Sequence, residues 1–478
     1  LVYRGEESAQ FLIHGELGPE RAFKIDVMHP STDNVPYAKT YTFQRILEQI
    51  IATFAFEPVL DPQKRCPNLV LAGGYNLPAL LPAYSIIDGI LLPSFVSQTP
   101  RQKRKGITPT IGFWVIEVVF DEKTKELKNV KPTLYNLTHY QLREDYLNDV
   151  HGAAFEKFTK DEKSVLEIVA SGPQTFGELS RRLNRSKETI KAIVERLMSK
   201  RKLAITVPAD TKEVTWDRNL KQKFGPLPDE LVKDMFATSV KVANVSDTHL
   251  CSTDQQLSML RLAYQIGDEE RVDVCQHTGD VSDGCASVGY RTHHKDVFIG
   301  GFTEQLKYMV KAYPSSRLGI KTKMIAGNHD WWDYETFGGD IVQELCDARP
   351  DLEYCGYPRH TYELKGFRIM LFHPGGGSAY ALSYQIQRHI MNQLRNKEPR
   401  VDAMFCGNWH KALYVLYAGV HGFLAPSMKG QDDLHQKLSL PNDRGLWIVE
   451  LTKDKNGRIT KVVPDYRDFT PLTKEKDY

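Results

Sequence analysis

The sequence lacks the features of a membrane-spanning, secreted or disulfide-bonded protein. No apolar run approaches the about 20 residues that crossing a bilayer requires, and residues 1–20 lack the basic start and apolar centre of a signal peptide. The seven cysteines are odd in number and include no C-x-x-C pair, which argues against a disulfide framework and against a structural zinc site. We therefore expect a soluble protein of a reducing, cytoplasmic compartment.

The chain also lacks an excess of charge of either sign. Lys and Arg together number 62, and Asp and Glu together number 60, so the overall charge predicts no particular partner and only local clusters are informative. The 478 residues are enough for about three domains. The chain begins with Leu1 and not with Met, and from this we expect further sequence upstream.

Five short apolar runs each end in residues of the kinds that bind metals. The first, over residues 240–245, leads to Asp247 and His249, which we expect side by side on one face at the carboxyl end of a buried strand. The other runs lead to Asp280 and Asp283, to Gly327-Asn328-His329-Asp330, to His373, and to Gly407-Asn408-Trp409-His410. Strands that alternate with helix-like segments predict an α/β sandwich whose site gathers at the strand carboxyl ends.

These motifs, D-x-H, G-D-x-x-D, G-N-H-D, a single His and G-N-x-H, resemble in their order the calcineurin-like metallophosphoesterases over roughly residues 239–470. Any one of them also fits a Gly-rich turn, but five in order do not. The resemblance implies a β-sandwich flanked by helices and a hydrolase of phosphate esters. It implies two divalent metal ions, with Mn²⁺ preferred and Fe or Zn²⁺ as alternatives.

The resemblance also implies a role for each motif residue. One metal would be held by Asp247, His249 and His410, and the other by Asn328 and His373, with Asp280 between the two. His329 would act on the substrate as general acid or stabiliser of the leaving oxygen, and Asp283 would orient His329. Asn408 stands where the family pattern has a histidine ligand of the second metal. An amide oxygen is a poorer donor than imidazole, so we expect a weaker second site.

Residues 1–150 repeat part of the later sequence. Residues 23–30 (FKIDVMHP) align with residues 367–374 (FRIMLFHP), and the alignment continues to residues 112–117 opposite 445–450. The repeat has no D-x-H, G-D-x-x-D or G-N-H-D, so His29 is the only ligand position that it keeps. We predict a degenerate, partial phosphoesterase-like α/β domain. Its open sheet edge favours an upstream segment as its cover, ahead of docking on the catalytic domain or on another chain such as a second copy.

Residues 155–216 have the pattern of a separate helical unit. We expect helices from Thr159 to Val169, over residues 176–183 and after Ser186, followed by a hairpin of residues 203–207 with 213–216. Three helices and a hairpin resemble a winged helix-turn-helix. Residues 217–238 read as a linker with one short helix.

A basic cluster lies in this unit. Between residues 181 and 202, nine Lys or Arg face two Glu, a local net charge of +7, which is typical of nucleic-acid binding. The candidate binding residues are Arg181, Arg182, Arg185, Lys187 and Lys191. The alternative is a solvated helix face in a winged helix that pairs with protein.

The leading hypothesis is a metal-dependent phosphodiesterase that acts on nucleic acid, as a nuclease, or on a nucleotide. One alternative is a phosphomonoesterase or protein phosphatase with the same metals. The other is a nucleic-acid-binding or assembly protein with weakened catalysis, which the decayed repeat and Asn408 favour.

Overall fold

The computed structural model describes residues 2–3, 8–18, 21–30, 38, 40–55, 66–95, 108–138, 159–169, 174–199, 205–207, 213–216, 233–285, 295–377, 380–440 and 442–478. The chain forms two compact units, one of residues 1–138 with 234–478 and one of residues 139–233. Both units mix helices and strands, and the first contains two large sheets. None of the described helices combines the length and the apolar character needed to cross a bilayer.

The larger sheet of the first unit has 11 strands among the described residues, in the order β1-β2-β3-β4-β6-β5-β19-β20-β18-β17-β16. The strands from the beginning of the chain are β1 (Val2–Tyr3), β2 (Ser8–Ile13), β3 (Phe23–Met28), β4 (Leu69–Ala72), β5 (Ala79–Tyr84) and β6 (Ile87–Leu91). Those from the later part are β16 (Arg359–Leu364), β17 (Phe367–Phe372), β18 (Ala403–Cys406), β19 (Leu413–Tyr417) and β20 (Val420–Leu424).

The second sheet of this unit has eight strands in the described residues, in the order β15-β14-β13-β12-β21-β22-β8-β7. The strands are β7 (Gly112–Phe120), β8 (Leu127–Asn136), β12 (Thr238–Val245), β13 (Val274–Thr278), β14 (Thr322–Ile325), β15 (Leu352–Tyr354), β21 (Gly445–Lys453) and β22 (Ile459–Asp468). The neighbours β12, β13, β14 and β15 run parallel, so their carboxyl ends meet at one edge of the sheet.

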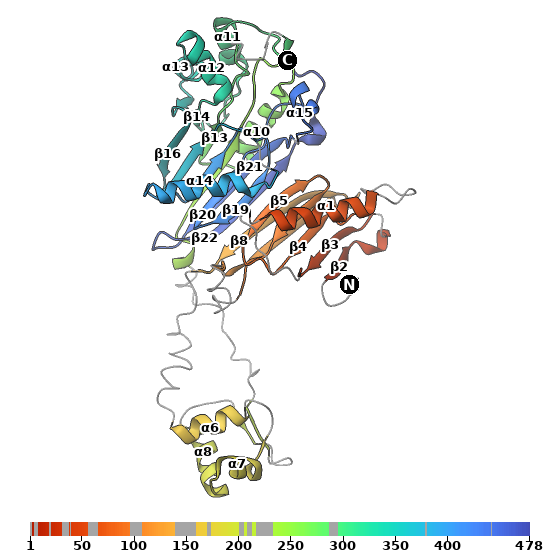
Figure 1. The fold of residues 1–478 in the computed structure, drawn as a ribbon, viewed down its shortest axis with the longest axis vertical. Helices are drawn as coiled ribbons and strands as arrows, with labels where there is room; N and C mark the ends of the chain where they lie inside the picture. The colour runs from red at the N-terminus through yellow and green to blue at the C-terminus, as the bar shows by residue number, and fades with distance from the viewer. Residues whose placement is uncertain are drawn as a thin grey trace. The chain divides into compact units, whose positions relative to one another are not determined.

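Helices cover the outer faces of the two stacked sheets. One face of the larger sheet carries α1 (Tyr41–Ala55) and α14 (Ser383–Arg395), each of which lies across the strands (Figure 1). The helices on the other sheet include α10 (Leu257–Glu269), α11 (Phe302–Ala312) and α13 (Ile341–Ala348). The remaining short elements are η1 (Gly15–Leu17), α12 (Asn328–Phe337), α15 (Asp433–Lys437) and η5 (Thr470–Leu472).

Three apolar cores join these four layers. Within β12, Val240 and Val242 face the core between the two sheets, whereas Ala243 and Val245 face the core beneath the helices. The alternation follows from the two-residue period of a strand. Because both faces of β12 are buried in its second half, four of the six residues 240–245 are apolar, and this run is the signal that predicts the strand.

The early and late strands of this unit have the same order and pairing sense. Strands β3 and β4 pair in parallel, as do β4 and β6, and β5 returns antiparallel to β6. The late strands β17, β18, β20 and β19 pair in the same senses. Individual bonds also correspond: the indole of Trp114 donates to the carbonyl of Leu91 over 3.0 Å, and that of Trp447 donates to the carbonyl of Leu424 over 2.8 Å.

The early strands pair directly with the late ones. Strand β5 lies antiparallel to β19, with Leu80 opposite Tyr414, and β8 lies antiparallel to β22, with Leu134 opposite Val462. The structure therefore shows residues 1–138 docked, at these two edges, on the later part of the chain. The sequence favours an upstream segment ahead of this arrangement. Two continuous sheets result.

The unit of residues 139–233 contains α6 (Lys160–Val169), α7 (Phe176–Leu183) and α8 (Lys187–Ser199). Its described strands, β9 (Gln174–Thr175), β10 (Ile205–Thr206) and β11 (Glu213–Trp216), form a sheet in the order β10-β11-β9. The expected caps are present, because the hydroxyls of Thr159 and Ser186 accept hydrogen bonds from the amides of Glu162 and Thr189. Most of the expected linker, residues 217–232, lies outside the described residues.

Candidate metal centre

The predicted ligands come from loops at the carboxyl ends of strands in both sheets. Asp247 and His249 follow β12, Asp280 follows β13, and Asn328 begins α12 just after β14. From the other sheet, His373 follows β17, while Asn408 and His410 follow β18. The two sheets thus deliver their polar ends to one region, as the sequence predicts.

Five of these residues have a left-handed backbone. The φ angles are +50° at Asp247, +43° at His249, +52° at Asp280, +76° at Asn408 and +50° at His410. Strand β12 ends at residue 245, so the prediction that Asp247 and His249 share the face of an extended strand is wrong: the chain turns at both. Such a conformation costs on the order of 1 kcal/mol or more in each non-glycine residue, and such strain is typical of functional loops.

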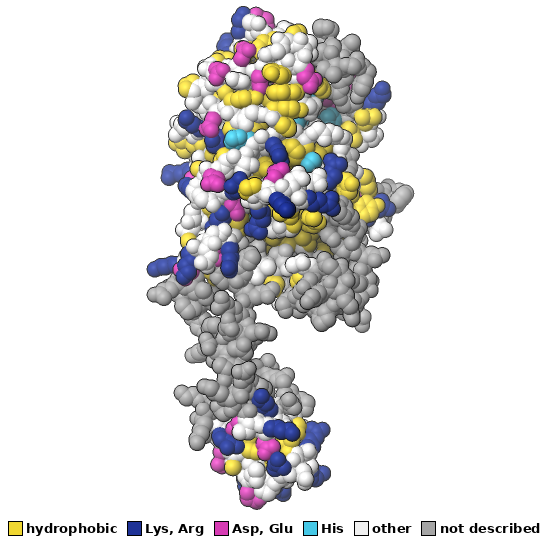
Figure 2. All heavy atoms as spheres, turned by 60° about the vertical axis from the view of Figure 1, so that its left-hand side comes forward, with side chains coloured by type: hydrophobic (Ala, Val, Ile, Leu, Met, Phe, Trp, Pro, Cys, Tyr) yellow, Lys and Arg dark blue, Asp and Glu magenta, His cyan; other side chains and the backbone are white. Residues whose placement is uncertain are grey.

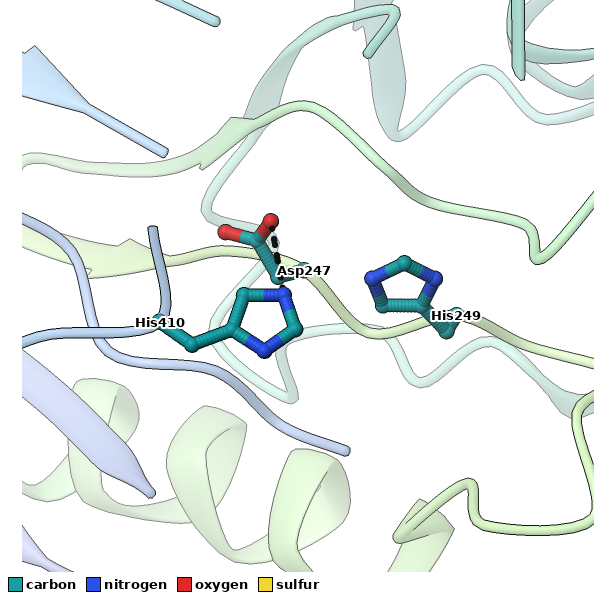
Figure 3. A group of neighbouring side chains, drawn as sticks. All are labelled: Asp247, His249 and His410. Carbon is teal, nitrogen blue, oxygen red and sulfur yellow. Dashed lines mark ion pairs between the residues drawn. The ribbon is translucent and has the colours of Figure 1, made fainter. Parts of the chain in front are cut away.

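The first group of candidate ligands is Asp247, His249 and His410, whose donor atoms lie within 4.8 Å of one another. Nε2 of His410 is 3.3 Å from the Asp247 carboxylate, and His249 lies beside this pair (Figure 3). Nδ1 of His249 is 2.8 Å from the Asp283 carboxylate, to which it donates. With its proton on Nδ1, the His249 ring has a lone pair on Nε2. The Nε2 atom is buried and makes no hydrogen bond to any described residue.

The second group centres on Asp280 and His373. Nδ1 of His373 donates to the carbonyl of Thr278 over 2.7 Å, and its Nε2 lies 3.1 Å from Oδ1 of Asn328 and 3.3 Å from Asp280. The Asp280 carboxylate is also 3.7 Å from Nε2 of His249. Asp280 therefore lies between the two groups, where a shared ligand would have to be.

The buried carboxylates and imidazoles strongly perturb one another. Burial alone would raise the pKa of Asp280, but His373 and His329 hold it well below its usual value. Burial opposes the charged form of His373, yet the Asp280 carboxylate raises the pKa of that ring to about 9. Without a metal, Asp280 is therefore negatively charged and His373 positively charged. A metal cation bound here would replace the proton of His373. Carboxylate, imidazole and amide donors without thiolate fit Mn²⁺, Fe or Zn²⁺.

His329 lies against the same loops but is held differently from the ligands. Its Nδ1 donates to the backbone carbonyl of Asp283 over 3.0 Å, whereas the Asp283 carboxylate is 3.7 Å away. The prediction that this carboxylate orients His329 is corrected: it hydrogen bonds His249, and the backbone carbonyl orients His329. Burial lowers the pKa of His329 to about 3, so the free ring is neutral. The indole of Trp332 packs against this ring at a tilt of 39°, with the ring centroids 4.0 Å apart.

Asn408 is tied both to the ligands and to a loop of three glycines, residues 375–377. Its backbone N–H donates to the Asp247 carboxylate over 3.0 Å, and its side-chain Nδ2 donates to the carbonyl of Gly376 over 3.0 Å. The side chain is half-buried. Asn408 therefore fixes Asp247 through its backbone, a function that does not depend on the side chain.

Sequence reasoning missed the role of Asp330 in holding two ligand loops together. Its carboxylate accepts from the amides of Val281, Ser282 and Gly327 over 2.8 to 3.0 Å. Burial, with a smaller contribution from Asp280, raises its pKa to about 7. The close approach also explains the glycine of G-N-H-D, because a Cβ at Gly327 would collide with the backbone of Asp280. The final Asp of the G-N-H-D motif was the sequence signal that could have indicated this role of Asp330.

Sequence reasoning also missed Lys429, which lies in the loop after β20. Only 3% of this lysine is exposed, and its ammonium group is 3.1 Å from the Asp283 carboxylate. No local pattern marks it, since 146 residues separate the two partners.

The five predicted nucleic-acid contacts lie in the unit of residues 139–233, and all are exposed. Arg181 and Arg182 lie on α7, and Lys187 and Lys191 lie on α8. Arg185, between the helices, is paired with Asp161 at 3.1 Å. Basic side chains are spread over the visible face of this unit (Figure 2).

Comparison with known proteins agrees with the geometry of the centre. Residues 240–412 match the calcineurin-like phosphoesterase family. Comparison with curated proteins gives no match. Among solved structures, an archaeal phosphodiesterase is 13% identical, with a TM-score of 0.28, over 47% of this chain and 99% of its own. A Vps29 variant from Entamoeba histolytica is 14% identical, with a TM-score of 0.25, over 48% of this chain and 100% of its own.

TM-scores this low do not establish a shared fold, so the assignment rests on the family match and on the ligand geometry. The matched segment contains all seven predicted metal ligands, from Asp247 to His410. The chain therefore carries, at residues 240–412, a calcineurin-like phosphoesterase domain, the domain of a hydrolase that acts on phosphate esters.

Proposed function

We propose that the chain hydrolyses a phosphodiester of nucleic acid or of a nucleotide at a dinuclear metal centre. The observation that carries the proposal is the position of Asp280, whose carboxylate lies 3.3 Å from His373 and 3.7 Å from His249. A carboxylate between two sets of donors fits a ligand shared by two cations. One set is Asp247, His249 and His410, and the other is Asn328, His373 and, as a weaker donor, Asn408.

Two divalent ions, when bound, would supply Lewis acidity and a water of lowered pKa. The chain's own residues orient the groups around them. Thr278 and Asp283 accept from Nδ1 of His373 and His249, which directs both Nε2 atoms towards the centre. Nδ1 of His329 is held by a carbonyl, so His329 would act on a substrate through Nε2. A bound phosphate would favour its protonated form, so that Nε2 donates to the leaving oxygen.

The nucleic-acid part of the proposal is supported by the smaller unit. Its order of elements, α6-β9-α7-α8-β10-β11, fits a winged helix, in which α8 would be the helix that enters a major groove. Lys187 and Lys191 are exposed on α8. Phosphate contacts of this kind provide affinity without sequence preference.

Alanine substitution tests this surface. We expect weaker duplex binding and a flatter salt dependence after replacement of Arg181, Arg182, Arg185, Lys187 and Lys191. A charge-matched control replaces five exposed basic residues of the other unit: Lys123, Lys125, Lys307, Lys311 and Arg317. Both variants should hydrolyse a small chromogenic ester normally. Equal duplex binding by the two variants at low salt would assign the winged helix to protein contacts.

The early strands are, in this proposal, a partial second phosphoesterase copy without a metal site. Residues 72–76 of the repeat align with residues 406–410, which places Asn76 opposite His410. Both residues have left-handed φ angles, of +56° and +50°. The carbonyl of Asn76 accepts from the amide of Thr110 over 3.0 Å, and that of His410 accepts from the amide of Asp443 over 2.9 Å. The loop is thus kept while the ligand is lost, which fits a structural role.

Metal analysis and two chromogenic substrates test the main proposal. We expect two ions per chain, loss of activity with a chelator, and recovery with Mn²⁺. Bis-nitrophenyl phosphate should be preferred over the mononitrophenyl ester. The opposite preference would indicate a phosphomonoesterase, and duplex binding without metal-dependent turnover would indicate a binding protein.

A further inference from the structure

Three residues that follow β20 form a polar cluster beside the first ligand group: Lys429, which is buried, and Asp432 and His435, which are partly buried. Only 3% of Lys429 is exposed, and its Nζ donates to Asp283 over 3.1 Å and to Asp432 over 2.9 Å. None of the three is a candidate ligand. Their contacts nevertheless lead by two routes to histidines of the centre.

The first route runs through Asp283 to His249. A single oxygen of Asp283, Oδ1, accepts from both Lys429 Nζ and His249 Nδ1, over 3.1 and 2.8 Å. The buried ammonium group holds that oxygen in place beside Nδ1 of His249. Lys429 therefore sets the plane of the His249 ring and the direction of its Nε2.

The second route runs through Asp432 to His410. The other oxygen of Asp432 accepts from Nδ1 of His435 over 2.7 Å. The His435 ring then stacks on the His410 ring, with centroids 4.7 Å apart and planes 16° apart. Nδ1 of His410 makes no hydrogen bond to a described residue. The stacking contact with His435 therefore helps to set the plane of the His410 ring.

We propose that Lys429, Asp432 and His435 are positioning residues that build the first metal site and leave the second one unaffected. The inference rests on the dinuclear centre proposed above. His373, in the second group, is oriented instead by the carbonyl of Thr278, to which the cluster makes no described contact. One segment thus holds the carboxylate that orients His249 and, through His435, contacts the ring of His410.

A purely structural role is a weak account of this lysine. Burying an ammonium group has a large desolvation cost, and replacing a buried ion pair with an apolar residue of similar size is often neutral or stabilising. Substitution of residues that hydrogen bond ligand histidines, by contrast, typically changes metal affinity about 10- to 100-fold. The two accounts predict different outcomes for the same substitution.

The test compares Lys429→Met with Lys453→Met, both of which break a buried Lys–Asp pair. Lys453 is 9% exposed and binds Asp402 over 2.7 Å. Asp402 precedes β18, whereas the ligands follow it, so this control lies at the opposite end of the strand. The readouts are Mn²⁺ titration by calorimetry and the melting temperature of the metal-free protein.

We expect wild type to bind two ions and Lys429→Met to bind one of them about 10- to 100-fold more weakly, with the other unchanged. His435→Ala should weaken the same ion. Lys429→Arg should restore most of the affinity, because a guanidinium group can also donate to both carboxylates. Lys453→Met should keep both affinities, whatever its melting temperature.

Three results would overturn the inference. Wild-type affinities for both ions in Lys429→Met would show that the lysine does not position His249. Equal weakening of both ions, with a melting temperature lowered as in Lys453→Met, would show a structural role. Fewer than two ions in wild type would overturn the dinuclear centre itself, and this inference with it.

Discussion

Asp280→Asn removes one negative charge from the centre and changes the volume very little. The carboxylate lies 3.3 Å from Nε2 of His373 and raises the pKa of that ring from 6.5 to about 9, which corresponds to about 3 kcal/mol. An amide can still accept from the amide of His329 through Oδ1, a bond of 2.9 Å, but it supplies no charge. Burial, which lowers the pKa of His373, is then opposed by the smaller effects of Asp247 and the Thr278 carbonyl.

We therefore expect the pKa of His373 to fall by about two units or more in Asp280→Asn, as the missing charge no longer favours the imidazolium form. The same lost charge should weaken metal binding by about 3 kcal/mol, or about 100-fold in affinity. Proton NMR titration of the histidines in the metal-free protein measures the first effect. Metal analysis and hydrolysis of bis-nitrophenyl phosphate measure the second.

Asp443→Asn is the control for this experiment. Asp443 is a carboxylate near the ligand loops that accepts from the amide of Ala412 over 2.8 Å, a bond that an amide oxygen can also accept. We expect this variant to keep its metal and its activity. An unchanged His373 titration in Asp280→Asn, or wild-type turnover with full metal content, would refute the assignment of Asp280 as the shared ligand.

Three further predictions concern the same centre. Asn408→His should raise the affinity for the second ion and the rate at limiting Mn²⁺, because imidazole is the better donor; an unchanged or lower rate at saturating Mn²⁺ would show that Asn408 is adapted to its bond with Gly376. His329→Ala should lower the rate about 100-fold with metal content unchanged, and loss of metal would mean that His329 is a ligand. Mn²⁺ affinity should rise about tenfold per pH unit between about pH 7 and 9, since below its pKa His373 must release a proton to bind. A flat profile from calorimetry at several pH values would exclude His373 from the site.

The strands of the centre were predictable because each is an apolar run that ends in polar residues. Residues 240–245 gave β12, and residues 369–372 lie within β17. The backbone at Asp247 was not predictable in the same way. Its amide donates to the carbonyl of Gly279, and its carbonyl accepts from the amide of Met428, so its left-handed conformation depends on two loops that are distant in sequence.

The same reason explains the other omissions. Lys429 follows no periodic pattern, and only the folded chain brings it to Asp283. The repeat could be aligned because side chains such as Trp114 and Trp447 occupy matching places. The alignment could not say which sheet edges would meet, because the choice between β19 and an outside segment as the partner of β5 depends on tertiary packing.

Strand β5 pairs with β19, and β8 pairs with β22. Each half of the larger unit therefore covers sheet edges of the other half that could otherwise aggregate. In the isolated late half, β19 and β22 would become edge strands with unpaired amides and carbonyls. Leu413, Val415 and Val462 have no exposed surface in the intact unit. Shared sheets also favour a single cooperative unfolding transition for the unit. A soluble fragment that carries the metal ligands should therefore retain residues 1–138, although that segment contributes no ligand of its own.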